Sequence, residues 1–210
     1  DNIDIVMNEL DALVNVNFVT REIHPRLKTL DIIRLGTSGS IQPDIPAGAV
    51  ALSSYGLGLD NLIHFYDFEE TGETREMSDQ LIRHTNWNKD LSRPYFVKGS
   101  DDLIRRFEKG TVKGITATAP GFYGPQGRVM RMQLHDPELN HKFSTFRFRD
   151  ERIINFEMET SALYSLGKIL GHNMVTLCLL IANRATNDYI TDHKPLIREM
   201  IKEVLDRLIA

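Results

Sequence analysis

Hydrophobic positions along the chain fall into short continuous runs that are separated by segments with helical spacing. The runs that predict strands lie at residues 30–35, 47–53, 95–97, 112–117, 153–156 and 174–182. The last run is apolar throughout, which is typical of a sheet strand buried on both faces. Strands that alternate with helices predict a single α/β domain whose sheet is covered by helices on both sides.

Helical spacing of apolar residues predicts the helices between these strands. Ile3, Val6, Leu10 and Leu13 define the first helix, with Asp1 or Asn2 as its cap. Further helices are expected near residues 77–82, at 101–108 and at 158–170. The last helix has Pro195 in its first turn and one apolar stripe, made of Leu196, Ile197, Met200, Ile201, Val204, Leu205, Leu208 and Ile209.

Composition narrows the classes of protein that fit this pattern. The 210 residues are 41% hydrophobic, which is enough for a substantial core. A net charge of -4, from 29 acidic and 25 basic residues, argues against nucleic-acid binding and against a polybasic membrane-surface protein. The single cysteine, Cys178, cannot form an internal disulfide, so we expect a reducing, cytoplasmic environment. The histidines show no metal-ligand spacing, and no metal site is predicted.

The first candidate segment for chemistry follows the strand at 30–35 and reads Arg34-Leu35-Gly36-Thr37-Ser38-Gly39. Ligands of α/β sheets bind beyond the carboxyl ends of the strands. Glycines let the backbone approach a ligand, while Arg34 and the hydroxyls of Thr37 and Ser38 are suited to an oxyanion such as phosphate. A tight turn after a strand would explain the glycines but not an arginine at the end of an apolar strand.

The second segment is the loop at residues 121–128. Phe122 and Tyr123 offer ring surface, and Gln126 and Arg128 offer an amide and a guanidinium two residues apart. A planar heterocycle would need such a set, with a face to stack on and groups that match its ring edge. Taken alone, the loop fits a polar surface turn equally well.

The third segment, Asn155-Phe156-Glu157-Met158-Glu159, begins the helix expected at 158–170. Glu159 shares the apolar stripe of Leu163, Leu166 and Leu170, so its carboxylate needs donors, and a ligand's hydroxyl pair would supply them. Glu157 points elsewhere and favours the helix N-terminus. Arg184, at the end of the run 174–182, is either a further site residue or a solvated strand end.

Four motifs follow one another along the chain: IRLGTSGSIQ at 33–42, FYGPQGR at 122–128, NFEME at 155–159 and IANR at 181–184. Together they resemble the motifs of the hexameric nucleoside phosphorylase family. Within it, they are most similar to the uridine-cleaving members. The resemblance implies a three-layer αβα domain over residues 1–210 with a central mixed, twisted sheet. It also implies pentosyl transfer: phosphate attacks a pyrimidine nucleoside and releases the base and ribose 1-phosphate, in nucleoside salvage and catabolism.

The resemblance also implies roles for single residues. Arg34 and Thr37 would hold phosphate, and Glu159 would bind the ribose hydroxyls. Glu157 and Met158 would also bind the substrate, with Met158 packed on the sugar, and Phe122 would lie against the base. Gln126 and Arg128 would bind the uracil edge, with Arg184 nearby. The implied catalytic residues are Arg34, Thr37, Arg128 and Glu159. No cofactor is implied, because inorganic phosphate is a co-substrate.

The family also raises expectations about assembly and about what precedes this chain. It implies homodimers with shared active sites, combined into hexamers. Family members begin with further strands and a phosphate loop, so the sequence is expected to be incomplete at its N-terminus. Asn183 stands where purine-cleaving members place an Asp, which favours uracil over a purine. The alternatives are a purine phosphorylase, a nucleosidase, or a non-catalytic nucleoside-binding or storage protein on this fold.

Overall fold

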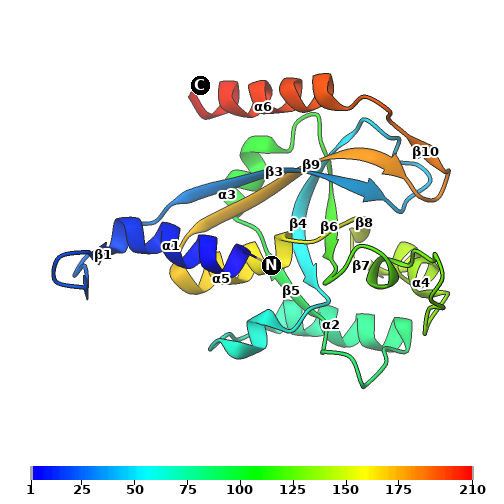
Figure 1. Cartoon of the computed structure of the whole chain (residues 1–210), viewed down its shortest axis with the longest axis horizontal. Coiled ribbons are helices and arrows are strands. Elements are labelled where there is room, and N and C mark those ends of the chain that lie inside the picture. Colours follow the sequence, from blue (N-terminus) through cyan, green and yellow to red (C-terminus); the bar gives the residue numbers. More distant parts are fainter. Residues whose placement is uncertain (1, 210) are drawn as a thin grey trace.

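The computed structural model describes residues 2–209 and contains one mixed sheet with helices on both faces (Figure 1). The elements in chain order are α1 (Ile3–Asn15), β1 (Val16–Asn17), β2 (Glu22–Ile23), β3 (Asp31–Ser40), β4 (Val50–Gly58), η1 (Leu62–Phe65), α2 (Gly72–Thr85), β5 (Tyr95–Lys98), α3 (Asp101–Phe107), β6 (Val112–Thr118), η2 (Gly124–Gln126), α4 (Leu139–Thr145), β7 (Arg147–Phe148), β8 (Glu151–Glu157), α5 (Thr160–Leu170), β9 (Asn173–Asn183), β10 (Asp188–Tyr189) and α6 (Lys194–Ile209). The predicted α/β class is confirmed.

The main sheet combines parallel and antiparallel pairs in the order β10-β9-β3-β8-β6-β4-β5. Strand β3 runs parallel to β9, whereas it runs antiparallel to β8. An additional antiparallel pairing of β4 with β9 joins two distant strands of this order, so that β9, β3, β8, β6 and β4 form a closed ring. The mixed sheet implied by the resemblance is therefore confirmed, and it curls back on itself.

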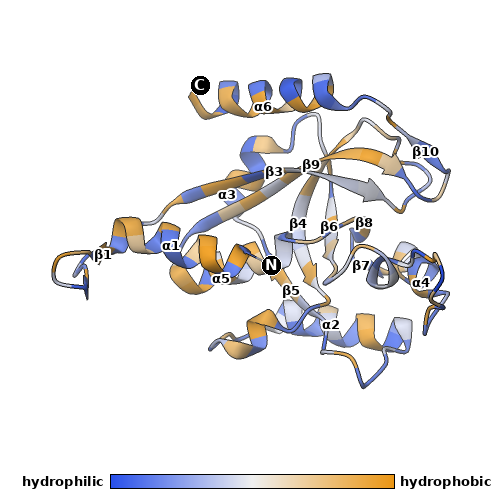
Figure 2. Ribbon diagram, viewed as in Figure 1, coloured by the Kyte–Doolittle hydropathy of each residue, from blue (hydrophilic) through white to orange (hydrophobic). Residues whose placement is uncertain are grey.

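Two apolar layers fix the helices to opposite faces of β3 and β9. On one face, α3 and α6 contribute Phe107, Met200 and Val204 to a cluster with Leu177 of β9. On the other face, α1 and α5 pack their apolar side chains against the start of β9. Figure 1 shows α6 on one side of these strands and α1 and α5 on the other, and Figure 2 shows hydrophobic stretches on both strands, most clearly towards the end of β9.

The structure corrects three expectations, two about element boundaries and one about burial. Residues 36–40, expected to lie beyond the strand at 30–35, continue β3, because the parallel pairing with β9 reaches Ser40 opposite Asn183. Helix α5 begins at Thr160, and Glu159 is its N-cap with a non-helical φ of -136°. Glu159 therefore does not belong to the helical stripe on which the sequence pattern places it.

The third correction concerns the stripe of α6. Only Met200 and Val204 of that stripe are fully buried, while Leu205 is 55% exposed and Ile209 is 86% exposed. At the other end of the chain, Asn2 occupies the N-cap of α1 without a side-chain hydrogen bond, and Asp1 lies outside the described residues. The sequence pattern did not predict α4 or the short strands β1, β2 and β7.

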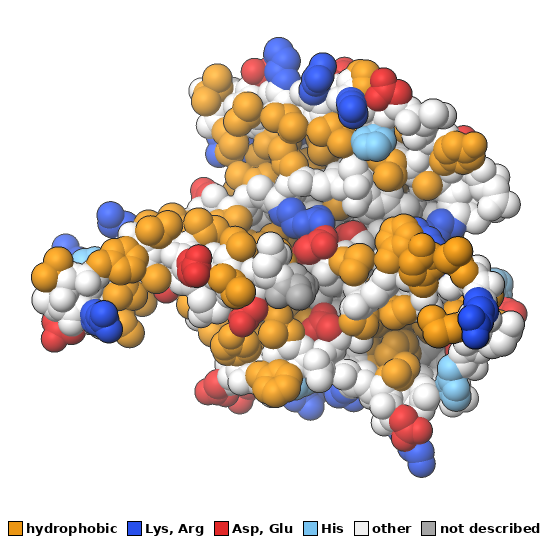
Figure 3. All heavy atoms as spheres, in the orientation of Figure 1, with side chains coloured by type: hydrophobic (Ala, Val, Ile, Leu, Met, Phe, Trp, Pro, Cys, Tyr) orange, Lys and Arg blue, Asp and Glu red, His pale blue; other side chains and the backbone are white. Residues whose placement is uncertain are grey.

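The β1–β2 hairpin extends away from the sheet and carries exposed hydrophobic side chains. Phe18 is 64% exposed, Val19 is 93% exposed and Ile23 is 72% exposed. In Figure 3 this projection, with α1 at its base, is marked by hydrophobic spheres on the left. The hairpin is remote from the polar strand ends that the sequence pattern indicates as a site.

Candidate active site

The predicted site residues line one cavity of about 590 Å³ at the ends of β3, β8 and β9 and beneath the loop that follows β6. Its lining comprises Arg34, Gly36, Thr37, Ser38, Gly39, Phe122, Gln126, Arg128, Phe156, Glu157, Met158, Glu159, Ile181, Ala182 and Arg184. Segments that are more than 140 residues apart in the sequence meet here through the β3–β9 pairing. The three segments and Arg184 thus share one cavity.

Arg34 reaches the cavity from within β3, where side chains alternate between the two faces. Ile32, two residues earlier, packs with the α1–α5 layer, and the Arg34 side chain lies on the same side of the strand. Gly36 makes room for it, because a Cβ at this position would lie 2.9 Å from Nη1 of Arg34. The glycine is therefore needed for close approach of a side chain, and not for a turn.

The Arg34 guanidinium contacts two carboxylates and a thiol. Nη2 forms an ion pair with Glu159, and Nη1 lies 3.2 Å from Oε2 of Glu157. Nη1 also donates to Sγ of Cys178 at 3.3 Å. Burial opposes the charge of this guanidinium, but Cys178, Glu157 and Glu159 outweigh it and raise the pKa of Arg34. Arg34 is thus a fixed cation in the cavity wall.

Glu157 is enclosed, and both of its oxygens are used by the protein. Oε1 accepts from the Thr118 hydroxyl at 2.6 Å, and Oε2 accepts from the backbone N–H groups of Glu159 and Thr160 at 2.9 Å each. Burial raises the pKa of Glu157, while Arg34 and the Thr118 hydroxyl oppose that rise. Glu157 thus caps the start of α5, as its position before the expected helix predicts.

Glu159 differs from Glu157 in its access to the cavity. Its side chain is 33% exposed, whereas that of Glu157 is 2% exposed. Its backbone is fixed by the bond to Glu157, and its Oε2 contacts Arg34. Of the two carboxylates that line the cavity, Glu159 is therefore the one that a ligand can reach.

The other end of the cavity is organised around Gln126, which is 2% exposed. Its Oε1 accepts from Nη1 of Arg128 at 2.7 Å and also from Arg184. Nη1 of Arg184 additionally donates to the Gln126 backbone oxygen at 2.8 Å. Two guanidinium groups bind the amide oxygen, and Nε2 of Gln126 has no hydrogen-bond partner in the described part of the chain, so it is left as a free donor. This end of the cavity is therefore rich in donors.

Arg184 is deeply placed and its Nε has no hydrogen-bond partner among the described residues. A Cβ on Gly39 would come within 3.0 Å of that atom, so the glycine admits the guanidinium at this depth. Burial, together with the nearby positive charge of Arg128, lowers the pKa of Arg184 to about 10. Arg184 therefore adds positive charge to this end of the cavity, which favours an anionic or carbonyl-bearing ligand.

Phe122 and Arg128 form the wall of the cavity on the side of the 121–128 loop. The guanidinium carbon of Arg128 lies 3.8 Å from the centroid of the Phe122 ring, and its Nη1 donates to the Phe122 backbone oxygen at 2.6 Å. Phe122 remains 51% exposed. The Phe122 ring and the guanidinium stacked on it together provide a flat, positively charged surface for a planar, electron-rich ligand.

Thr37 and Met158 also line the cavity. Ser38 lines the cavity as well, and its hydroxyl accepts a hydrogen bond from Nδ2 of Asn155 at 2.8 Å. This bond connects β3 to β8 and holds the glycine-containing end of β3 in place.

Asn183 lies outside the cavity lining and is fully used by the protein. Its Nδ2 donates to the backbone oxygens of Gln42 and Ile45, at 2.9 and 2.7 Å, and its Oδ1 accepts from the N–H groups of Ala185 and Thr186. The side chain therefore shapes the turn after β9 and has no free group for a ligand.

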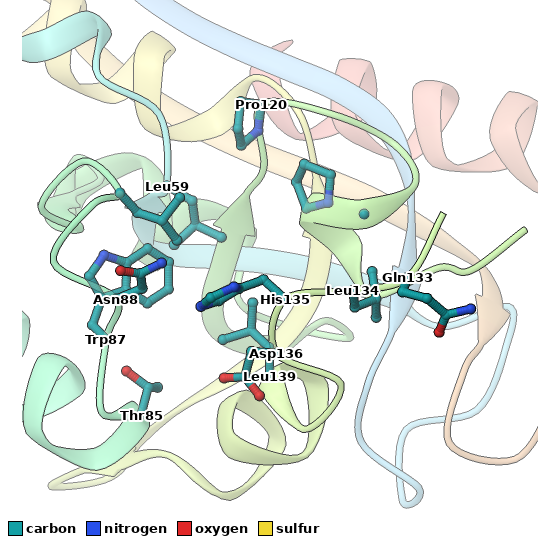
Figure 4. A pocket seen from close by; sticks show the side chains of 13 residues that line it. Leu59, Thr85, Trp87, Asn88, Pro120, Gln133, Leu134, His135, Asp136 and Leu139 are labelled. Carbon is teal, nitrogen blue, oxygen red and sulfur yellow. The ribbon is translucent and has the colours of Figure 1, made fainter. Parts of the chain in front are cut away.

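A second cavity, of about 280 Å³, lies on the opposite side of the same loop. Pro120, Gly124 and Pro125 line this cavity, whereas Phe122 and Gln126 line the first one. Leu59, Trp87 and Leu139 lie around His135 in it (Figure 4). It contains no arginine, and none of the predicted site residues lines it, so the larger, charged cavity is the candidate active site.

Sequence reasoning missed two residues that hydrogen-bond to site residues: Thr118, which contacts Glu157, and Cys178, which contacts Arg34. Thr118 ends β6 and bonds to Glu157, which lies 39 residues away in the sequence. Cys178 lies opposite Gly36 in the β3–β9 register. A threonine at the end of a strand was a visible signal, whereas the position of Cys178 depends on a register that the sequence does not give.

Residues 2–209 contain neither a metal-binding cluster nor a membrane-spanning helix. In this described part of the chain, no group of histidine, cysteine, aspartate and glutamate side chains has the geometry of a metal centre. None of the helices in the same range is long and apolar enough to cross a membrane.

Comparison with known proteins decides the family. The model of the phosphorylase superfamily matches residues 12–210. The chain belongs to this superfamily. A uridine phosphorylase of Thermococcus kodakarensis is 29% identical over 163 residues, which are 75% of this chain and 50% of that protein. Mouse uridine phosphorylase 1 is 27% identical over 83% of this chain and 52% of its own length. The superfamily member described here thus spans about half the length of these curated relatives.

Solved structures share the fold of this phosphorylase-superfamily chain. A Trypanosoma brucei nucleoside phosphorylase, reported to show uridine phosphorylase activity, superposes with a TM-score of 0.86 at 24% identity, covering 100% of this chain and 76% of that one. Isoform 2 of uridine phosphorylase from Schistosoma mansoni gives a TM-score of 0.63 at 22% identity, covering 97% and 67%. The three-layer fold with its mixed sheet is therefore that of nucleoside phosphorylases.

Proposed function

We propose that this chain carries the catalytic site for phosphorolysis of a pyrimidine nucleoside, with uridine as substrate. An oxygen of inorganic phosphate forms a bond to C1′ of the ribose while the bond from C1′ to N1 of uracil breaks. The electron pair of the broken bond goes to uracil, which takes up the proton that hydrogen phosphate gives up, passed on through water. The products are ribose 1-phosphate and uracil.

The cavity offers a suitable group for each part of this reaction. Arg34 lies at one end and would bind phosphate with Thr37, and the accessible carboxylate of Glu159 would accept from the ribose hydroxyls. Met158 would pack against the sugar. At the other end, Phe122 would contact the base, and Gln126, Arg128 and Arg184 would donate to its carbonyl oxygens.

The donor-rich end of the cavity is the observation that carries the proposal. Two guanidinium groups fix the amide oxygen of Gln126 and leave its NH₂ group free. Negative charge develops on the leaving base as the glycosidic bond breaks, so donors fixed in advance stabilise the transition state. Losing one such donor costs about 3 kcal/mol of transition-state stabilisation in comparable sites. No metal or organic cofactor takes part in the proposed reaction.

The assembly and location that accompany this proposal are inferences of the same kind. We propose a homodimer with shared active sites, assembled into a hexamer in the reducing cytoplasm. Sedimentation velocity of the purified chain would measure its oligomeric state, and a monomer at micromolar concentration would contradict the proposed assembly.

The experiment that tests the proposed reaction follows base release by absorbance. Uridine, thymidine and inosine are each supplied with and without phosphate, and Arg34→Ala serves as the matched variant. We expect uridine to be cleaved only with phosphate, and the variant to lose most of that activity. Cleavage of inosine alone would contradict the pyrimidine assignment, and phosphate-independent cleavage would indicate a nucleosidase. Uridine binding without any cleavage would indicate a binding or storage protein.

A further inference from the structure

The ion pair between Arg34 and Glu159 joins the two halves of the cavity. Nη2 of Arg34 donates to Oε2 of Glu159. Within residues 2–209, this arginine reaches no other carboxylate that is open to a ligand, because Glu157 is buried. Under the proposed function, phosphate needs Arg34 and the ribose hydroxyls need Glu159. The two substrates would therefore compete with the protein for the two members of one ion pair.

The surroundings make this ion pair exchangeable without disturbing the fold. Arg34 keeps its contacts to Glu157 at 3.2 Å and to Cys178 at 3.3 Å when Nη2 leaves Glu159. Glu159 keeps its backbone bond to Glu157, and its side chain is one-third exposed. The pair can open through side-chain rotation alone, while these other contacts of the two residues remain in place.

Electrostatics then links the two binding events. An oxyanion on Arg34 lies beside the Glu159 carboxylate, and like charges at that separation repel. Ribose hydroxyls that donate to Glu159 stabilise its charge in the opened position and leave the guanidinium free for the oxyanion. Whichever ligand binds first bears the cost of opening the pair, so the second ligand binds more tightly.

We infer that the Arg34–Glu159 ion pair is a shared latch that couples oxyanion binding to ribose binding, so that each ligand tightens the binding of the other. The coupling is reciprocal, because it is one free energy shared by two sites. This inference rests on the proposed function, since it takes the oxyanion and the ribose to be the two ligands.

Calorimetric titration tests the latch without turnover when sulfate replaces phosphate. We expect saturating sulfate to lower the Kd of uridine at least about fivefold, the lower end of ordinary coupling between sites. For 2′,3′-dideoxyuridine, which lacks the hydroxyls that would bind Glu159, sulfate should leave the Kd unchanged. Glu159→Gln should weaken uridine, tighten sulfate alone and abolish the coupling.

The matched control is Asp44→Asn, which breaks an arginine–carboxylate pair elsewhere, the pair of Asp44 with Arg152 at 2.7 Å. This variant should keep the full coupling. If uridine and sulfate bind independently to a protein that is active, the latch is overturned and the proposed function is unaffected. Equal coupling for uridine and the dideoxy analogue would also overturn it. Failure of uridine to bind at all would overturn the proposed function, and the latch with it.

Discussion

Gln126 is the residue on which the base end of the cavity depends, although its sequence context is an ordinary glycine- and proline-rich loop. Its amide is buried, and its orientation follows from the two guanidinium groups that bind Oε1. The residue types of this site could be predicted from sequence, since every residue predicted to bind substrate or phosphate lines one cavity. The orientation of the Gln126 amide could not, because Arg184 lies 58 residues away.

Replacing Arg128 with alanine removes one of the two donors that fix the amide of Gln126 and the cation that stacks on Phe122. We expect Arg128→Ala to reduce kcat/KM for uridine about 100-fold or more, in line with the loss of one preorganised donor. The KM for phosphate should change much less, because Arg34 lies at the other end of the cavity. Steady-state kinetics with each substrate varied in turn measures both effects, and an equal loss for both substrates would contradict the assignment of the loop.

At the scale of elements, the start of α5 differs from the prediction because its cap comes from outside the helix. The apolar spacing of Leu163, Leu166 and Leu170 extends back to Glu159, but the Glu157 carboxylate binds the N–H groups there and starts the helix at Thr160. Likewise, the glycines of β3 suggested a turn, but the neighbouring strand β9 supplies hydrogen bonds as far as Ser40. Long-range partners overrode local pattern in both places.

Helix α5 lies so close to β4 that a side chain at Gly56 would strike its backbone. A Cβ there would be 2.9 Å from Cα of Ser161, an atom that cannot move without the helix. We expect Gly56→Ala to lower the free energy of unfolding by about 1–3 kcal/mol, the usual cost of overpacking. The shift of α5 would also displace Glu159 and reduce activity.

Urea denaturation measures this loss, and Gly72→Ala is the matched control. Gly72 lies in the first turn of α2, and a Cβ added to it would have no other atom within 4 Å. Alanine at this position should leave stability equal or raise it by up to about 1 kcal/mol. A Gly56→Ala protein as stable as the control would show that α5 is free to move away from β4.

At the scale of the whole molecule, the closed ring of strands is the feature least accessible to sequence. The runs at 112–117, 153–156 and 174–182 correctly predicted the strands β6, β8 and β9. The order of the strands and the β4–β9 pairing that closes the ring depend on contacts between distant segments, and no local pattern encodes them. The mixed sheet was expected only from the family resemblance.

Cys178 reports on the integrity of that ring, because it lies in β9 between β3 and β4 and is fully buried. Burial raises the pKa of its thiol to about 11, so the thiol is neutral at pH 8 and becomes a thiolate only as the pH approaches 11. We expect a disulfide reagent to label the native protein at pH 8 only as fast as it unfolds globally. Spectrophotometric labelling rates measure this, and rapid labelling of the native protein at pH 8 would mean that the strand ring opens locally.

The identity of the sugar product tests the central claim most directly, because it records which nucleophile reached C1′. Phosphorus-31 NMR of the reaction with uridine and phosphate, alongside quantification of uracil, would identify and count that product. The account predicts one ribose 1-phosphate for each uracil released. Free ribose in place of the phosphate ester would contradict it.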